Sequence, residues 1–232
     1  MVGDLAKYKQ AAAEHAVANF VKSGMVVGLG HGSTALYAAR HLAELLKAGK
    51  LKDIQGVPCS LAVEREAKRL GIPLTTLDEH PGVDVTIDGA DEIDPDLNLI
   101  KGGGGALLRE KIVAQASARE VIVADHTKQS PALGTKFRLP VEALPFGWRL
   151  QAEYLAGLQG GKIKLRKNES SGPFLTDQGN YLLDCDFGAM EDLHGLARAI
   201  ESRAGILEHG LFLDLATDLV VAGPDGVQHI AK

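Results

Sequence analysis

Apolar residues in the first half of the chain alternate between short β-branched runs and longer segments with helical spacing. The short runs predict strands at 25–29, 53–58, 73–77, 83–87 and 121–124. The longer segments predict helices at 5–21, from Thr34 to about Lys47, at 61–70 and at 106–117. Strands that alternate with helices favour an α/β fold, with a mostly parallel sheet covered by helices on both faces.

The pattern changes near residue 133. Apolar runs there predict strands at 137–144, 163–166, 181–187 and 206–212, and helical spacing predicts helices at 150–158 and 190–202. Two β-α-β halves of this kind are typical of a smaller α+β domain of ferredoxin-like type. Runs at 219–222 and 227–231 then return to the first sheet. We therefore expect a main α/β domain at 1–132 and 213–232, with the small domain inserted at 133–212.

Composition limits the classes of partner and compartment. The 232 residues include 25 basic and 30 acidic side chains, which give a net charge of −5 without a basic cluster, so no nucleic-acid partner is expected. No apolar run approaches the roughly 18–20 residues that span a bilayer, and the N-terminus lacks a secretory pattern. We expect a cytoplasmic protein without a membrane partner. Cys59 and Cys185 lack CxxC spacing, so both should be reduced and no zinc site is indicated.

A glycine-rich turn joins the first predicted strand to the next helix. It reads Gly30-His31-Gly32-Ser33-Thr34. Backbone N–H groups at such a helix start suit a phosphate or sugar hydroxyls. A dinucleotide or nucleoside triphosphate is disfavoured, because Ser33 replaces the last glycine of GxGxxG and no Walker lysine follows.

A second glycine-rich segment follows the strand at 83–87. Asp88-Gly89-Ala90-Asp91 comes first, and Lys101 with Gly102–Gly105 then leads into a helix. The aspartates could be ordinary turn formers, the lysine a solvated surface residue and the glycines a flexible loop. Four consecutive glycines are costly in backbone entropy, however, so we expect something to approach that backbone closely.

Glu110 is the candidate base. On a helical wheel at about 100° per residue its neighbours are Ala106, Leu107, Val113 and Ala114, so it occupies an apolar arc. Burial there would disfavour the charged form and raise the pKa of the carboxyl toward the range useful to a general base. The alternative is a solvated glutamate that favours the helix dipole.

Separate motifs in this chain resemble those of the type A ribose-5-phosphate isomerase family. The signature TIDGADEID at 86–94, KGGGG at 101–105 and LREKI at 108–112 closely resembles that of the family. Further similar runs are GLGHGSTA at 28–35, ADHTK at 124–128, LPVEALPFG at 139–147 and VAGPDGV at 221–227. Together they extend over nearly the whole chain.

The resemblance implies an aldose–ketose isomerase that interconverts D-ribose 5-phosphate and D-ribulose 5-phosphate in the non-oxidative branch of the pentose phosphate pathway. Ring opening and a cis-enediol intermediate would need no metal and no cofactor, and family members are commonly dimers or tetramers. The implied catalytic residues are Glu110 as base, Lys101, Asp88 and Asp91. The implied substrate-binding residues are His31, Gly32, Ser33, Thr34, Asp88, Gly89, Ala90, Asp91, Lys101, Gly102, Gly103, Gly104 and Lys128.

Three positions depart from the family pattern. His31 stands where the loop usually reads GTGST, Gln10 where relatives often carry a second lysine, and Cys59 where threonine is usual. Two other functions stay open. A sugar-phosphate sensor without turnover is one, although it has no need for a glutamate on an apolar arc. Acyl or coenzyme A transfer is the other, although the chain is short for it.

Overall fold

The computed structural model describes residues 2–232. Contacts divide the chain into two compact units, each of which is discontinuous in sequence. Unit 1 comprises Met1–Ala90, Arg109–Lys128 and Asp214–Lys232, and unit 2 comprises Asp91–Leu108 and Gln129–Leu213. The domain limits expected from the sequence, at 133 and 212, remain a prediction.

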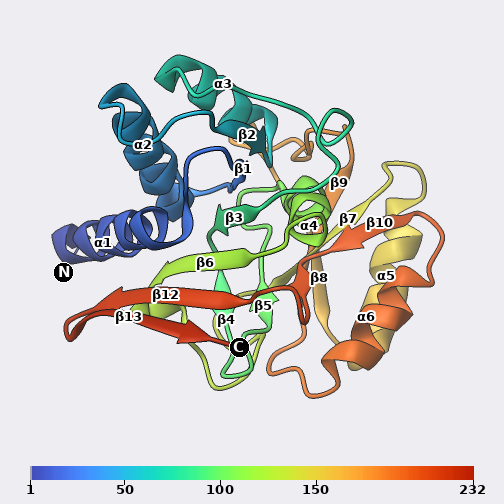
Figure 1. Cartoon of the computed structure of the whole chain (residues 1–232). Coiled ribbons are helices and arrows are strands. Elements are labelled where there is room, and N and C mark those ends of the chain that lie inside the picture. The colour runs from blue at the N-terminus through green and yellow to red at the C-terminus, as the bar shows by residue number, and fades with distance from the viewer. Residues whose placement is uncertain (1) are drawn as a thin grey trace. The chain divides into compact units, whose positions relative to one another are not determined.

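Unit 1 is built on a six-stranded sheet in the order β13-β12-β6-β3-β1-β2 (Figure 1). Neighbouring strands are parallel except for the β12–β13 pair at one edge. This confirms the mostly parallel sheet. The strands are β1 Val26–Leu29, β2 Gln55–Pro58, β3 Val85–Asp88, β6 Glu120–Asp125, β12 Asp218–Gly223 and β13 Gly226–Ala231.

Helices pack on both faces of this sheet. Helices α1 Val2–Phe20, α2 Ser33–Lys47 and α3 Leu61–Leu70 contribute to one buried apolar cluster, which includes Val27 of β1. The preceding residue, Val26, packs instead with Val113 of α4 Leu107–Gln115, in a cluster on the opposite face. Adjacent strand residues point to opposite faces, so α4 covers the side that α1 to α3 leave open.

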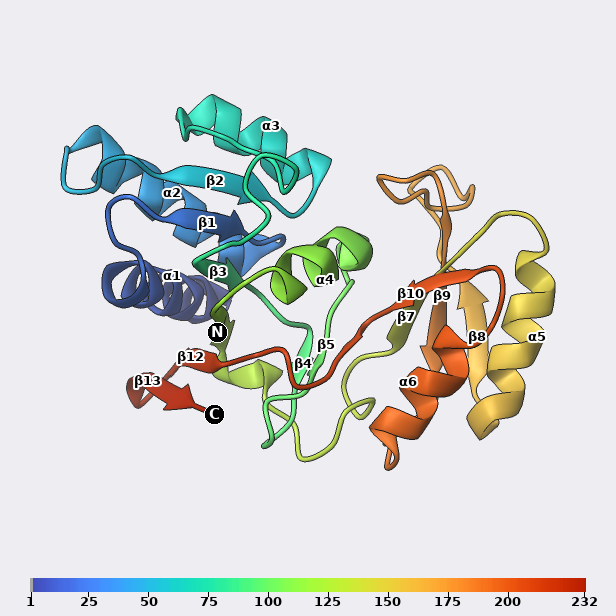
Figure 2. The ribbon, with the colours of Figure 1, turned by 45° about the vertical axis from the view of Figure 1, so that its right-hand side comes forward.

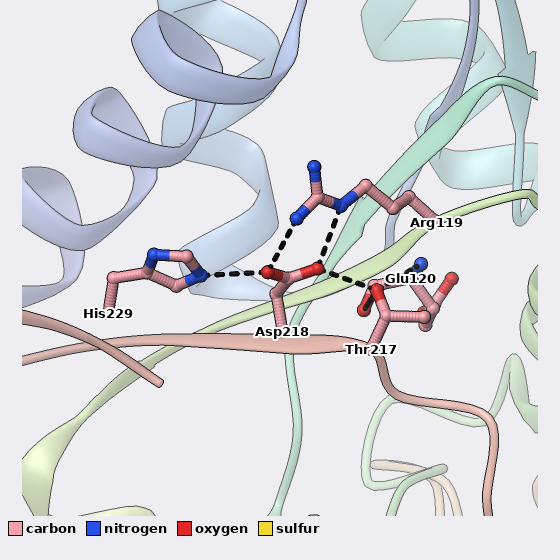
Figure 3. Close-up of polar contacts among 5 residues, drawn as sticks. All are labelled: Arg119, Glu120, Thr217, Asp218 and His229. Atoms are coloured by element: carbon pink, nitrogen blue, oxygen red, sulfur yellow. Dashed lines mark hydrogen bonds and ion pairs between the residues drawn. The ribbon is translucent and has the colours of Figure 1, made fainter. Parts of the chain in front are cut away.

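A polar network within unit 1 connects β12, β13 and the residue that precedes β6 (Figure 3). Asp218, at the start of β12, is buried and accepts two hydrogen bonds from the Arg119 guanidinium, at 2.9 and 3.0 Å. His229 of β13 lies 2.7 Å from the same carboxylate through Nε2, and the Thr217 hydroxyl donates to it at 2.7 Å. The network therefore links β13 to the segment that leads into β6.

Unit 2 contains an antiparallel sheet in the order β10-β7-β9-β8. In chain order its elements are β7 Leu139–Ala143, α5 Trp148–Gln159, β8 Lys162–Leu165, β9 Tyr181–Asp186, α6 Leu193–Glu201 and β10 Ile206–His209. Both helices lie on one face of the sheet (Figure 2). The βαββαβ sequence with this strand order confirms the ferredoxin-like arrangement.

One predicted strand was wrong, and another is divided into two strands. The run at 73–77 makes only a single bridge, between Leu74 and Gly56, because the chain turns where the Thr75 hydroxyl bonds the side chains of Glu79 and His80. The run at 206–212 is broken at Gly210. Its second part, β11 Leu211–Phe212, pairs with β5 Leu99–Ile100, which also pairs with β4 Glu92–Ile93. This three-stranded sheet of unit 2 was not predicted.

Candidate functional site

Two candidate loops of unit 1 meet where the strand order reverses. Strand β1 has β2 on one side and β3 on the other, so the loops that follow β1 and β3 leave the same sheet edge side by side. Asp88 ends β3 and is fully buried, and its Oδ1 accepts the backbone N–H of His31 at 2.9 Å. A Cβ on Gly30 would lie 2.4 Å from the Asp88 Cα, so only glycine fits there.

The start of α2 supplies donors to this edge. Its N-cap is Gly32, with φ of 107° and no side-chain cap, so the first amides of the helix are left for another acceptor. Ser33 is exposed, and its Oγ lies 3.1 Å from the Nζ of Lys9 on α1. Lys9, which directly precedes the Gln10 departure in α1, was not singled out from the sequence.

The His31 ring has a structural role in this unit. Its Nδ1 lies 2.9 Å from the Ser60 hydroxyl, which also accepts the Val63 N–H at 3.0 Å as the N-cap of α3. The ring thus connects the glycine turn to the start of α3. Gln10, the second departure, bonds Glu14 within α1 at 2.7 Å.

Lys128 follows β6 at the same sheet edge. It ends the 3-10 helix η1 His126–Lys128 and is half-buried. The buried carboxylate of Asp125 orients this turn by accepting both the amide and the hydroxyl hydrogen of Thr127. The turn is further held where the His126 ring meets the Tyr8 ring edge-on, with centroids 5.6 Å apart.

Glu110 lies on α4 with 4 % of its surface exposed. The burial expected from the helical wheel is therefore confirmed, and the solvated alternative is wrong. Its flanking residues Val113 and Ala114 are buried too. A carboxylate in this position meets the first requirement for a general base, because bulk water does not compete for the proton that it takes up.

Lys101 belongs to unit 2 and is also buried, with 2 % exposed. Its amide donates to the Gly210 carbonyl at 2.9 Å, and its Nζ lies 5.3 Å from the centroid of the Phe212 ring. Lys101 is therefore not a solvated surface lysine. An ammonium group over an aromatic ring face is attracted by the ring's negative electrostatic potential, so the Phe212 ring partly offsets the cost of burying this side chain.

Close approach of neighbouring side chains explains most of the glycine run. A Cβ on Gly102 would lie 2.8 Å from Leu107, one on Gly103 2.6 Å from the Asp91 carboxylate, and one on Gly105 2.5 Å from the Phe174 ring. What approaches this backbone is thus the protein itself. Asp91 also accepts the Gly103 N–H at 2.7 Å, while Gly104 is exposed.

Comparison with known proteins decides the family. The family model described as ribose 5-phosphate isomerase A (phosphoriboisomerase A) matches residues 55–226. The chain belongs to the ribose 5-phosphate isomerase A family. A relative from Chloroflexus aurantiacus, named ribose-5-phosphate isomerase A, is 59% identical over 222 residues, which cover 96% of this chain and 92% of the relative.

Solved structures of the family have the same fold. Ribose 5-phosphate isomerase from Plasmodium falciparum superimposes with a TM-score of 0.95 at 40% identity, covering 98% of this chain and 99% of that one. A D-ribose-5-phosphate isomerase in complex with phospho-erythronic acid also gives a TM-score of 0.95, at 35% identity, with coverage of 98% and 99%. The predicted family and fold are therefore confirmed.

Glu92 lies inside the family motif TIDGADEID but was not singled out from the sequence. Its buried carboxylate accepts the amides of Gly134, Lys136 and Phe137 at 2.8 to 3.1 Å, and the Thr135 hydroxyl at 2.8 Å. Burial acts to raise the pKa of Glu92, but hydrogen bonds from the Ser130 and Thr135 hydroxyls and from the Gly134 and Lys136 amides outweigh it and hold the pKa below the usual range. Glu92 is thus an anchor for the 134–137 loop of unit 2.

One group of side chains among the described residues has the spacing of a metal site, namely Glu201, Glu208 and His209. The His209 Nδ1 accepts the Leu211 N–H at 3.2 Å, so the neutral ring carries its proton on Nε2, 3.2 Å from Glu201. That proton occupies the position that a metal would need. The geometry favours a hydrogen-bonded pair over a metal centre.

The predicted site residues fall in both units. Unit 1 holds His31, Gly32, Ser33, Thr34, Asp88, Gly89, Ala90, Glu110 and Lys128, and unit 2 holds Asp91, Lys101, Gly102, Gly103 and Gly104. Their assignment to one site stays a prediction. Cys59 and Cys185 are buried thiols that are not joined in a disulfide. No helix within residues 2–232 is long and apolar enough to cross a bilayer.

Proposed function

We propose that the chain catalyses the interconversion of D-ribose 5-phosphate and D-ribulose 5-phosphate. The observation that carries this proposal is the 59% identity, over nearly the full length of both chains, to a relative named ribose-5-phosphate isomerase A. The reaction moves a proton between adjacent carbons while their oxygens exchange roles. It therefore needs a base, a group that stabilises negative charge on oxygen, and a means of opening the furanose ring.

Glu110 is the proposed base. Its carboxylate takes the proton from C2 and returns it to C1, with a cis-enediol as the intermediate. The proposal is supported by the burial of Glu110 on an apolar arc of α4, where solvent does not compete for the transferred proton.

Lys101 and the glycine loop are the proposed electrophilic group. Negative charge develops on the substrate oxygens as the proton leaves C2, and a buried cation stabilises that charge more strongly than a solvated one. Asp88 and Asp91 are proposed to bind the sugar hydroxyls and to transfer the protons that ring opening requires. Both aspartates already hold backbone amides, of His31 and Gly103 respectively.

The substrate phosphate is proposed to bind at the start of α2. The uncapped amides there, the Ser33 and Thr34 hydroxyls and the Lys9 ammonium offer donors and positive charge, and Lys128 lies on the same sheet edge. Gly89 and Ala90 complete the proposed substrate contacts in this unit.

Replacing the base separates catalysis from binding. Glu110→Gln should lower kcat by about 10²–10⁴-fold, the range that a general base contributes, while phospho-erythronic acid still binds. The matched control is Glu64→Gln, which removes a surface carboxylate paired with Lys68 and should leave the rate unchanged. Turnover of ribose 5-phosphate is measured directly as ribulose 5-phosphate formed. Wild-type turnover in Glu110→Gln would refute the base assignment.

The remaining expectations belong to the same proposal. We infer that no metal or cofactor takes part, so chelators should leave the rate unchanged. We also propose a cytoplasmic homo-oligomer, a dimer or tetramer, in place of a 24.6 kDa monomer. A light-scattering mass of one chain would contradict the assembly.

A further inference from the structure

Arg166 lies directly behind the glycine loop of unit 2. It follows β8, and its Nη1 donates to the carbonyl oxygens of Gly102 at 2.9 Å and Gly103 at 3.0 Å. The other edge of the guanidinium bonds the Asp184 carboxylate on β9, with Nε 3.1 Å from Oδ2. Both side chains are largely buried, at 15% and 21% exposed. One planar guanidinium thus donates to two consecutive peptide groups, and Asp184 on β9 fixes its orientation.

These contacts fix the direction of the loop amides. In a trans peptide the C=O and N–H point in opposite directions, so a donor that holds the carbonyl also orients the amide. The peptide group between Gly102 and Gly103 is fixed at both ends. Arg166 donates a hydrogen bond to its carbonyl oxygen, and Asp91 accepts one from its N–H at 2.7 Å. The next peptide group is held at the Gly103 carbonyl, so the N–H of the exposed Gly104 points away from Arg166.

The glycine sequence makes these hydrogen bonds necessary. Glycine peptide groups have no Cβ to restrict them, and Gly102 already adopts a φ of 100°. A flip of the first peptide group would move the Gly103 N–H away from Asp91. A flip of the second would turn the Gly104 N–H toward the guanidinium. Lysine cannot replace Arg166 here, because a single ammonium group lacks the rigid, planar set of donors that bonds two carbonyl oxygens and a carboxylate at once.

We propose that Arg166 is a positioning residue for the isomerisation, and that it acts with Asp184 by fixing the Gly103 and Gly104 amides and the Asp91 carboxylate. The inference rests on the proposed function, in which Asp91 and this loop contact the substrate. Arg166 itself does not touch the reacting atoms. Its loss should therefore act on the step in which charge develops more than on substrate binding.

The first experiment compares kinetics of three variants. Arg166→Ala and Arg166→Lys should lower kcat by about 10- to 100-fold, with KM changed by less than about threefold, because misplacement of a preorganised group affects the transition state most. The matched control is Arg138→Ala, which removes an exposed arginine paired with Asp186 at 3.4 Å in the same unit. This control should keep kcat within about twofold of wild type.

The second experiment uses chemical rescue. Arg166 lines a cavity of about 580 Å³ that is also bordered by Arg138, Asp184 and Gly103, so a free guanidinium ion can reach the space left by the side chain. Millimolar guanidinium should raise the kcat of Arg166→Ala several-fold with saturation, whereas ammonium should not. Neither salt should change the kcat of Arg138→Ala.

The outcomes separate this inference from the proposed function. A wild-type chain without turnover refutes the function before any variant is compared. Wild-type kcat in both Arg166 variants, or a loss that guanidinium does not relieve, overturns the positioning role. Should Arg166→Ala fail to fold, Asp184→Asn gives the deciding test, because it keeps the shape of the pair while removing the charge that anchors the guanidinium. An unchanged kcat in a folded Asp184→Asn also overturns the inference.

Discussion

Glu142 is a fully buried carboxylate in β7. One of its oxygens accepts hydrogen bonds from the Thr176 hydroxyl at 2.8 Å and the Asn180 amide at 2.9 Å. Among the described residues, no group donates a hydrogen bond to the other oxygen. Burial raises the pKa of Glu142 despite those two bonds, and the nearby carboxylates of Glu208 and Asp177 raise it further.

Glu142→Gln should therefore stabilise the protein at neutral pH by on the order of 1 kcal/mol. A carboxyl whose folded pKa exceeds its unfolded value binds a proton on folding, so stability falls as pH rises from near 4.5 through the folded pKa. The gain should be larger at pH 8 than at pH 5, as measured by urea unfolding. Glu142→Ala should instead destabilise, because Thr176 and Asn180 lose their acceptor. Equal stability of wild type and Glu142→Gln at pH 8 would contradict the reasoning.

Single residues of the site were predictable where the signal was local. The apolar arc around Glu110 follows from helical spacing alone, and its burial is confirmed. Glu92, Lys9 and Arg166 were missed, because their partners lie far along the chain: Arg166, for instance, reaches a loop 63 to 64 residues away. No pattern in the sequence brings such pairs together before the fold is known.

The glycine loop as an element combines two separate demands on its residues. Gly105 has a φ of 83°, and a Cβ there would also lie 2.5 Å from Phe174. Gly160, at the end of α5, has a similar φ of 67° but open space around its Cβ position. The pair therefore separates backbone strain from steric overlap.

Gly160→Ala should cost only the left-handed backbone penalty of about 1 kcal/mol. Gly105→Ala should cost that amount plus an overlap term of about 1–3 kcal/mol, because the Phe174 ring has to move. The free energy of unfolding from chemical denaturation checks both values. Equal losses in the two variants would show that the ring yields freely.

Most elements were predictable because their apolar spacing is regular. The helix at 61–70 matches α3 throughout its length, and the strands at 121–124 and 181–187 match β6 and β9 within one residue at each end. The two-residue strands β4, β5 and β11 are too short to show a period, and they form only by pairing with one another. The break at Gly210 is a packing effect, because a Cβ there would lie 2.3 Å from the Lys101 carbonyl oxygen.

At the scale of the whole molecule, the network around Asp218 joins residues 99 positions apart in sequence. Burial acts to raise the pKa of Asp218, but hydrogen bonds from Arg119, Thr217 and His229 outweigh it and lower the pKa. A lowered folded pKa gives stability that is present above the unfolded value, near 3.8, and is lost as pH falls through the folded pKa.

Asp218→Asn should therefore lower the free energy of unfolding at pH 7 by about 2 kcal/mol, and by less at pH 3, where the unfolded carboxyl is already mostly protonated and the charge-dependent stability has begun to fall. The control is Asp186→Asn, which breaks the exposed pair with Arg138 and should change stability by less than about 1 kcal/mol. Denaturant unfolding at the two pH values checks this. The same loss at both would contradict the charge dependence.

The class of fold and the family were predictable at this scale, because alternating elements and several ordered motifs extend along the chain. The network in Figure 3 could not be predicted. Asp218 comes directly before the strand predicted at 219–222 and resembles any solvated aspartate in the sequence. Its burial depends on β12 inserting between β6 and β13.

That insertion has a consequence for synthesis. Strand β6 leaves the ribosome with all six residues destined for burial, yet its neighbour β12 is translated only after the whole of unit 2. At roughly 5–20 residues per second, the nascent chain carries this uncovered edge for on the order of ten seconds. Newly made molecules are therefore most open to mispairing, and most in need of chaperones, before the final strands emerge.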